Sequence, residues 1–212
     1  MIFEKTTKKS SYILYNIYID FLCKITYNNT YKGGAIMGLH SEIRELINAM
    51  AYTVKEIYEI DTPISNIDSV VKKMGGEVLE DSSLDRFSDG RIKKISENSF
   101  EIRVSPFQSE ERRNFTIAHE LGHLFLHMGF QTDETQWRNQ DNIAYYRNGN
   151  SNTEYQSNEF AAAFLMPEKD YKQIMDKYTE NGRVNTSEIA KYFHVSIDAA
   201  ANRGKWLGYL EW

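Results

Sequence analysis

The sequence predicts an α+β protein that is mainly helical, with a small antiparallel sheet and a C-terminal helical module of the helix-turn-helix type. Three observations lead to this prediction. Apolar residues recur at helical spacing in several segments, two short segments alternate as the strands of a hairpin do, and the C-terminal stretch reads as helix, tight turn, helix. With 212 residues, 41% of them hydrophobic and 26% charged, the chain is long enough for one or two domains with a core.

The first 36 residues are expected to be a non-native or disordered extension. The apolar run from Tyr12 to Leu22 is interrupted by Asn16 and Asp20. It is too short to span a membrane and is not followed by a small-residue cleavage site. The Lys-Gly-Gly that precedes Met37 can be encoded by codons that spell a ribosome-binding sequence. We therefore expect translation to begin at Met37.

A first domain is expected over residues 37–168, and it begins with helices. Apolar residues follow helical spacing from Leu39 to about Ile60, and the Thr-Pro pair that follows stops that helix. A second, short helix is expected from Asn66 to Met74, where two glycines end it.

Three strands are expected next in the chain. Residues 77–80 read as a strand, and residues 91–95 and 100–104 read as a hairpin around the polar turn 96–99. The apolar residues of the last strand alternate, so they share one face, as in a half-buried sheet.

Two helices and a long loop complete the first domain. Ser109, followed by two glutamates, predicts the start of a helix that runs to about Met128. Residues 131–152 are polar and Asn-rich without periodicity, which indicates a flexible loop. A further helix is expected from about Thr153 to Met166, where a proline stops it.

Composition limits the possible partners and the compartment. The formal net charge of −5 gives no general attraction to nucleic acid or to anionic lipid. We expect neither direct nucleic-acid binding nor attachment to a membrane. A single cysteine, Cys23, excludes a disulfide within the chain and fits a reducing compartment. The expected location is therefore the cytoplasm.

The segment TIAHELGHLFLH, residues 116–127, holds three of the five histidines. When each residue of a helix advances by about 100°, four side chains fall within about 100° of His119. These four are Thr116, Glu120, His123 and His127. The apolar residues centre on the other side, so the helix buries one side and presents imidazoles on a stripe of their own.

Within that stripe, His119-Glu120-Leu121-Gly122-His123 is the HExxH pattern. Imidazoles four residues apart project from adjacent turns and can reach one metal ion, while the glutamate takes a proton from the attacking water. The alternative is two satisfied core histidines and a surface glutamate. His127 continues the stripe but lies too far along the helix to be a third ligand. We expect it to support a ligand or the structure.

A catalytic zinc site takes three protein ligands and leaves one position for water. In the helix expected over residues 153–166, Glu154 lies about 50° from the centre of the buried face and Glu159 about 170° from it. Glu154 is therefore the preferred third ligand, and Glu159 is expected to point to solvent. Asn158, one turn after Glu154, is placed to hydrogen-bond a ligand histidine. The alternative for Glu154 is a helix-start acid that only offsets the helix dipole.

These motifs together resemble the ImmA/IrrE family of metallopeptidases. The resemblance is carried by RNFTIAHELGHLFLH, residues 113–127, followed by a Glu-x-x-Ser-Asn-x-Phe-Ala-x-x-Phe-Leu-Met-Pro segment, residues 154–167. The resemblance covers roughly residues 40–210 and implies a zincin-like domain. The sequence departs from the usual pattern in Ser157, where alanine is usual, and in the long loop before Glu154.

The resemblance also implies roles for four residues. His119 and His123 bind the metal, Glu120 is the catalytic acid and base, and Glu154 is the third ligand. The metal is Zn²⁺, with Mn²⁺ as the alternative. Characterised members cleave a helix-turn-helix repressor and so release its target genes, often on mobile elements or in stress-response loci.

The C-terminal module is expected over residues 169–212. Residues 185–207 alone would suggest a DNA-binding helix-turn-helix, with Asn185 and Ser196 as caps of its two helices. Its charges are too balanced for a phosphate-binding face; they are Arg183, Lys191, Arg203 and Lys205 against Glu188, Asp198 and Glu211. The resemblance points instead to a helical module packed beside the peptidase.

The sequence thus predicts a zinc-dependent endopeptidase that cleaves a helix-turn-helix repressor. The alternative is a non-catalytic regulator in which a metal only stabilises a fold that binds DNA, a repressor or an antitoxin. We also expect the strand at residues 100–104, if it is an exposed edge, to pair with the extended backbone of the substrate.

Overall fold

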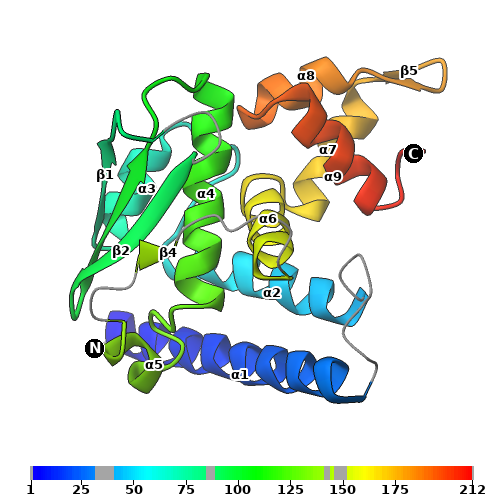
Figure 1. The fold of residues 1–212 in the computed structure, drawn as a ribbon. Helices are drawn as coiled ribbons and strands as arrows, with labels where there is room; N and C mark the ends of the chain where they lie inside the picture. Colours follow the sequence, from blue (N-terminus) through cyan, green and yellow to red (C-terminus); the bar gives the residue numbers. More distant parts are fainter. Residues whose placement is uncertain (1, 32–40, 85–88, 141–143, 146–151, 212) are drawn as a thin grey trace.

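Helix α4 (Glu110–Leu126) lies at the centre of the molecule, between a four-stranded sheet on one side and helix α6 (Asn152–Leu165) on the other (Figure 1). The structure is a computed structural model that describes residues 2–31, 41–84, 89–140, 144–145 and 152–211. Ser109 caps α4, as predicted, because its side chain accepts a hydrogen bond from the backbone N–H of Arg112.

The sheet has the strand order β1-β3-β2-β4. Strands β2 (Gly90–Ser96) and β3 (Ser99–Val104) form the predicted hairpin, and β4 (Ala144–Tyr145) pairs antiparallel with β2. Strand β1 (Gly76–Glu80) runs parallel to β3 on its other side. The α+β class is therefore confirmed, but the sheet is mixed and not wholly antiparallel.

The position of β3 also corrects a functional expectation. Because β1 pairs along its whole length and β2 along the other edge, β3 is a central strand and its backbone groups are already used. Substrate pairing at residues 100–104 was expected only if this strand is an exposed edge, and that condition is not met. The hydrophobic pattern could not show this, since a half-buried strand alternates in the same way at either position in the sheet.

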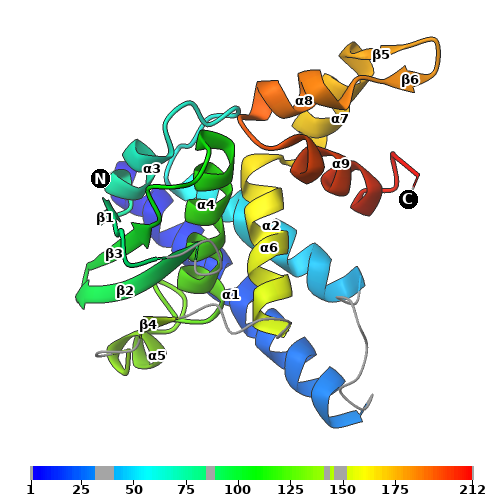
Figure 2. The ribbon, with the colours of Figure 1, turned by 45° about the horizontal axis from the view of Figure 1, so that its top comes forward.

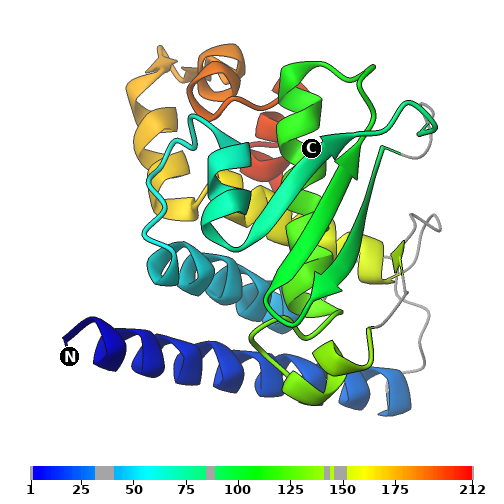
Figure 3. The same ribbon diagram turned by 90° about the vertical axis from the view of Figure 1, so that its left-hand side faces the viewer.

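The N-terminal half adds three helices. Helix α2 (Ser41–Ile57) packs against α6, and the short α3 (Ile67–Lys73) packs beside β1 and is capped by Asn66. Helix α1 (Ile2–Tyr31) lies along α2 beneath the rest of the molecule (Figure 3). Within the described part of the chain, no helix combines the length and apolar character that crossing a membrane requires.

Among the residues of α1 whose burial is described, 12–26, three side chains are almost completely buried; they are Leu14, Tyr18 and Phe21. The Tyr18 hydroxyl also donates a hydrogen bond to the side chain of Gln136. Residues 32–40, which include Met37, lie outside the described residues. The start of translation at Met37 and the division into segments 1–36, 37–168 and 169–212 stay predictions.

The segment expected to be a loop without structure contains a short helix, α5 (Glu134–Arg138). Asp133 caps it, and the indole N–H of Trp137 donates to the backbone oxygen of Glu97 over 2.7 Å. The Trp137 ring meets Phe130 edge to face, with 5.0 Å between the ring centroids. Buried aromatic packing therefore orders this part of the segment, whereas residues 141–143 and 146–151 lie outside the described residues.

The C-terminal part contains α7 (Glu168–Lys177), α8 (Thr186–Phe193) and α9 (Ile197–Trp206), with a small hairpin of β5 (Thr179–Glu180) and β6 (Arg183–Val184). The side chain of Asn185 accepts from the backbone of Glu188, and that of Ser196 accepts from Ala199, so both predicted caps are present. Figure 2 shows these helices gathered beside α6.

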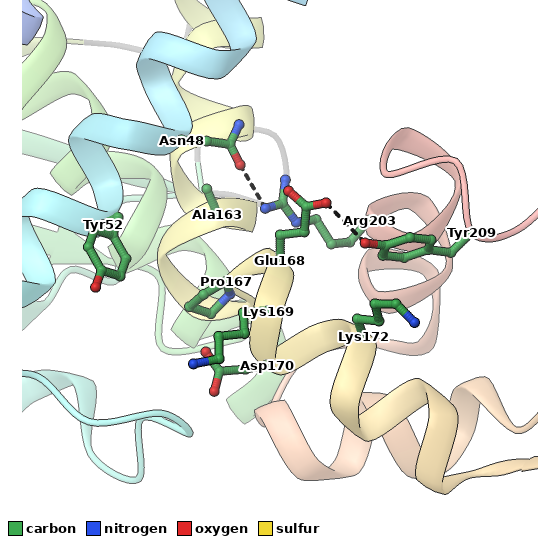
Figure 4. Close-up of a pocket in the computed structure, with 10 residues that line it drawn as sticks. All are labelled: Asn48, Tyr52, Ala163, Pro167, Glu168, Lys169, Asp170, Lys172, Arg203 and Tyr209. Atoms are coloured by element: carbon green, nitrogen blue, oxygen red, sulfur yellow. Dashed lines mark hydrogen bonds between the residues drawn. The ribbon is translucent and has the colours of Figure 1, made fainter.

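A buried ion pair attaches this helical group to the rest of the protein. Arg203 of α9 is 2% exposed. It donates to Glu159 Oε1 over 3.0 Å, to Asn48 Oδ1 over 2.7 Å and to the backbone oxygen of Met166 over 3.1 Å. Figure 4 shows the bond between Arg203 and Asn48. Arg44 of α2 lies 3.4 Å from the second oxygen of Glu159.

The expectation that Glu159 points to solvent is wrong, because its side chain is only 7% exposed. The prediction considered only the angle between Glu159 and the single apolar face of α6. Residues of α2 and α9, which are distant in the sequence, cover the other side of α6 and supply the partners of the carboxylate.

Replacement of Arg203 by methionine is expected to destabilise the protein by about 3 to 5 kcal/mol, because it leaves the buried Glu159 carboxylate without its main partner. Urea unfolding of both proteins would measure this change in the free energy of unfolding. The matched control is Lys172→Met, which removes an exposed pair with Asp176 and should cost less than about 1 kcal/mol. Equal small losses in the two variants would show that the Arg203 pair does not fasten the C-terminal helices.

Candidate metal centre

The structure brings His119, His123 and Glu154 together at the contact between α4 and α6. The Nε2 atoms of the two histidines are 3.1 Å apart. Glu154 Oε2 is 3.2 Å from His119 Nε2, and Glu154 Oε1 is 3.4 Å from His123 Nε2. All three residues are buried, and they form a group that could hold a metal ion.

The spacing of these donor atoms suits a zinc ion. Ligand atoms at 2.0–2.1 Å from a tetrahedral ion lie about 3.3 Å from one another. The three separations in the structure, 3.1, 3.2 and 3.4 Å, are close to that value. Two imidazoles and one carboxylate are also a ligand set of catalytic zinc sites, which keep one further position for water.

The hydrogen bonds around the two histidines leave Nε2 of each ring directed to the centre. Asn158 Oδ1 lies 2.8 Å from His119 Nδ1, so this carboxamide oxygen accepts the Nδ1 proton. Asn158 therefore does what the sequence analysis expected of it. With the proton held on Nδ1, the lone pair on Nε2 of His119 is available to a metal.

A second chain of hydrogen bonds serves His123 in the same way. His127 Nε2 lies 2.8 Å from Gln156 Oε1, so His127 donates from Nε2 and carries its lone pair on Nδ1. His127 Nδ1 is 3.1 Å from His123 Nδ1 and accepts the proton of that ring. His127 thus hydrogen-bonds the candidate ligand His123, and Gln156 fixes the orientation of His127.

Burial and hydrogen bonding set the charges of this group. Burial, followed by the neighbouring His123, lowers the pKa of His127 to about 3, so this ring is neutral at ordinary pH. For Glu154, burial alone raises the pKa of the carboxyl group. The neighbouring His119 and His123 side chains outweigh it, and the pKa lies below its usual range. The acid is therefore ionised, as a metal ligand must be.

Glu120 lies beside strand β2 and is 3% exposed. A methyl group added to Gly90 would lie 3.0 Å from Glu120 Oε1 and 2.6 Å from Cγ2 of Thr116. The first residue of β2 must therefore lack a side chain to pass this close to α4. This approach places the backbone of β2 directly next to the carboxylate of the HExxH motif.

The two helices that carry the ligands touch at Gly122 and Ser157. A methyl group added to Gly122 would lie 2.9 Å from Cα and 3.1 Å from Cβ of Ser157, which real structures do not tolerate without movement. Gly122 thus lets α6 approach closely enough for Glu154 to reach the two histidines. Ser157 is the position at which the sequence departs from the usual alanine.

All the residues singled out from the sequence, His119, Glu120, His123, His127, Glu154 and Asn158, lie in this one region. The sequence analysis missed Gln156, Gly90 and the role of Gly122. Helical spacing put Gln156 about 200° from Glu154, so no periodic signal related it to the site. The glycine inside HExxH was the one available sign of a close helix contact.

Comparison with known proteins gives two similarities. The Peptidase_M78 family model, described as the IrrE N-terminal-like domain, matches residues 78–205, more than half of the chain. No curated protein matches the chain significantly. Among solved structures, a Mycobacterium tuberculosis transcriptional regulator is similar at 15% identity with a TM-score of 0.39, over 96% of this chain and 52% of that one. The chain thus spans about half the length of that structure, and this similarity is too low to support an argument.

Replacement of Gly122 by alanine is expected to force α4 and α6 apart and so to weaken zinc binding and lower stability, the latter by about 1 to 3 kcal/mol. Competition with a chromogenic chelator would measure the affinity for zinc. Gly182→Ala is the control, because that glycine has φ +74° and no atom within 4 Å of an added methyl group. Gly182→Ala should lower stability through backbone strain and leave the affinity for zinc unchanged. Equal zinc affinity in Gly122→Ala and Gly182→Ala would refute the role of Gly122.

Variants His127→Leu and Asn158→Ala each remove the group that holds the Nδ1 proton of one ligand histidine. Each is expected to weaken zinc binding about 10- to 100-fold. His194→Ala serves as the control, since this histidine lies exposed in the turn after α8. Should all three variants bind zinc as the unaltered protein does, the proposed hydrogen-bonded support does not operate.

Proposed function

The chain belongs to the peptidase family of the IrrE N-terminal-like domain, and on that premise we propose that it is a zinc-dependent endopeptidase. The proposal rests on the buried group of His119, His123 and Glu154, together with the buried Glu120, which directly follows His119 in the sequence. Membership of this family supports protease activity and a role as a regulator of the metallopeptidase type. The choice of zinc, the residue roles and the substrate are our inference.

Glu120 is the proposed general base and general acid. Its carboxylate takes a proton from the attacking water and later delivers it to the nitrogen of the leaving group. His119, His123 and Glu154 would hold the ion. When bound, zinc supplies Lewis-acid chemistry that polarises the scissile carbonyl and makes water a stronger acid. Manganese is the alternative metal, although two imidazoles suit zinc better.

The proposed substrate is a helix-turn-helix repressor, whose cleavage releases genes of a mobile element or a stress response. This part rests on the resemblance to the ImmA/IrrE family. Such a repressor acts in the cytoplasm, which is therefore the proposed location. We do not propose direct DNA binding, because the C-terminal helices carry opposite charges in nearly equal number.

Replacement of Glu120 by glutamine separates the peptidase from a regulator that only uses metal for stability. The variant is expected to bind zinc as tightly as the unaltered protein and to cleave at least about 100-fold more slowly, because the amide cannot accept the proton. The measurement is cleavage of the repressor encoded by the neighbouring gene, followed by mass spectrometry.

Addition of a chelator to the unaltered protein should abolish the same cleavage, and added zinc should restore it. Unchanged cleavage by Glu120→Gln would contradict the proposed chemistry. If the neighbouring repressor binds equally to both proteins and is cleaved by neither, the non-catalytic regulator becomes the better account.

A further inference from the structure

A groove of about 900 Å³ lies between α6 and α9, with α4 at one end. One face of α6 lines it through Tyr155, Asn158, Glu159 and Ala162, at the spacing of a single helical face. One face of α9 lines the opposite side at the same spacing through Ala199, Asn202, Arg203 and Trp206. We call it the α6–α9 groove, and its two helices lie side by side in Figures 1 and 2.

Three residues that line this groove are neighbours of the candidate metal centre. Asn158 lines the groove and also accepts the proton of His119. Tyr155 lines it and directly follows the expected ligand Glu154. Thr116 lines it from α4, on the stripe that carries the HExxH motif. A peptide bond held at the centre would therefore continue into the groove on one side.

The arginines that line the groove are already paired with its acids. Glu159 pairs with both Arg203 and Arg44, and Arg112 lies 2.5 Å from Asp89. Since these ions satisfy one another, they offer little to a charged ligand. The apolar part of the lining is formed by Phe115, Ala162, Ala199 and Trp206, whose ring Arg44 covers on one side, and the exposed Asp198 is also part of the lining.

Size and shape also favour a ligand in this groove. Binding cavities commonly span about 300 to 1,000 Å³ and have apolar walls with a few polar groups. Another hollow, of about 660 Å³ and drawn in Figure 4, shares only Arg203 with the lining of this groove. It is lined by exposed lysines and acids of α7 and has no residue of α4, so it lacks this connection to the metal centre.

We infer that the α6–α9 groove holds the substrate segment on one side of the scissile bond, an inference that rests on the proposed function. The groove selects a bulky apolar side chain in that segment. Ala162 of α6 and Ala199 of α9, which both line the groove, set the space for that side chain. The C-terminal helices are then one wall of the substrate site. The family match over residues 78–205 includes all of α9 except Trp206.

The first test is a cleavage profile on a pool of random-sequence decapeptides with the zinc-loaded protein, its Ala199→Trp variant and its Ala162→Leu variant. The unaltered protein should prefer Phe, Tyr, Trp, Leu or Met at one position beside the cleaved bond. Both variants should raise KM for such peptides about tenfold or more, with kcat little changed, and shift the preference to small residues. A profile identical in all three proteins would overturn the inference.

The second test does not need cleavage and uses the Glu120→Gln protein loaded with zinc. Acetyl-Ala-Phe-Ala-amide and acetyl-Ala-Asp-Ala-amide are titrated in and followed by NMR. The Phe peptide should bind more tightly than the Asp peptide, and adding Ala199→Trp should remove that difference. Equal binding of both peptides, or no effect of Ala199→Trp, would overturn the inference.

Ala201→Trp is the matched control, because it puts the same side chain on α9 outside the groove lining. It should leave the cleavage profile and the peptide binding unchanged, and melting curves would show that all variants are folded. If no peptide in the pool is cut but the Phe peptide binds as stated, the proposed peptidase activity fails while the groove assignment stands.

Discussion

The close contact between α4 and α6 is the constraint on which the site depends. Two histidines on adjacent turns of α4 can share one ion, but the third ligand has to come from a different helix. Gly122 removes the side chain that would hold α6 away, so that Glu154 reaches within 3.4 Å of both imidazoles. The same contact brings Asn158 to His119 and Gln156 to His127, and these bonds direct the lone pair of each ligand histidine inward. The close approach of α4 and α6 therefore determines both the packing at this contact and the positions of the candidate ligand atoms.

A second interaction connects this site to the C-terminal helices. Arg203 extends from α9 into the contact between α2 and α6 and meets Glu159, five residues after Glu154. Because both partners are buried, removal of one costs far more than removal of an exposed pair. The pair thus gives α9 a fixed place beside the candidate centre. The helix-turn-helix-like segment, which by itself would suggest DNA binding, is thereby placed where it can form the proposed wall of the substrate site.

The sequence predicted much of this arrangement where a single element carries the information. The HExxH stripe, the Ser109 and Ser196 caps and the β2–β3 hairpin all depend on neighbours within a few residues. Predictions failed where a distant segment decides the environment. Glu159 seemed exposed only because its partners on α2 and α9 were unknown, and β3 became central because β1 pairs with it in parallel. Likewise α4 is buried on its histidine side as well as on its apolar side, since α6 covers the stripe.

X-ray absorption spectroscopy of the zinc-loaded protein tests the central claim most directly, because it reports the atoms bound to the ion itself. The account predicts two imidazole nitrogens and one carboxylate oxygen, with a further light atom from solvent, and loss of the carboxylate contribution in Glu154→Gln. A spectrum that lacks imidazole, or one that Glu154→Gln leaves unaltered, would contradict it.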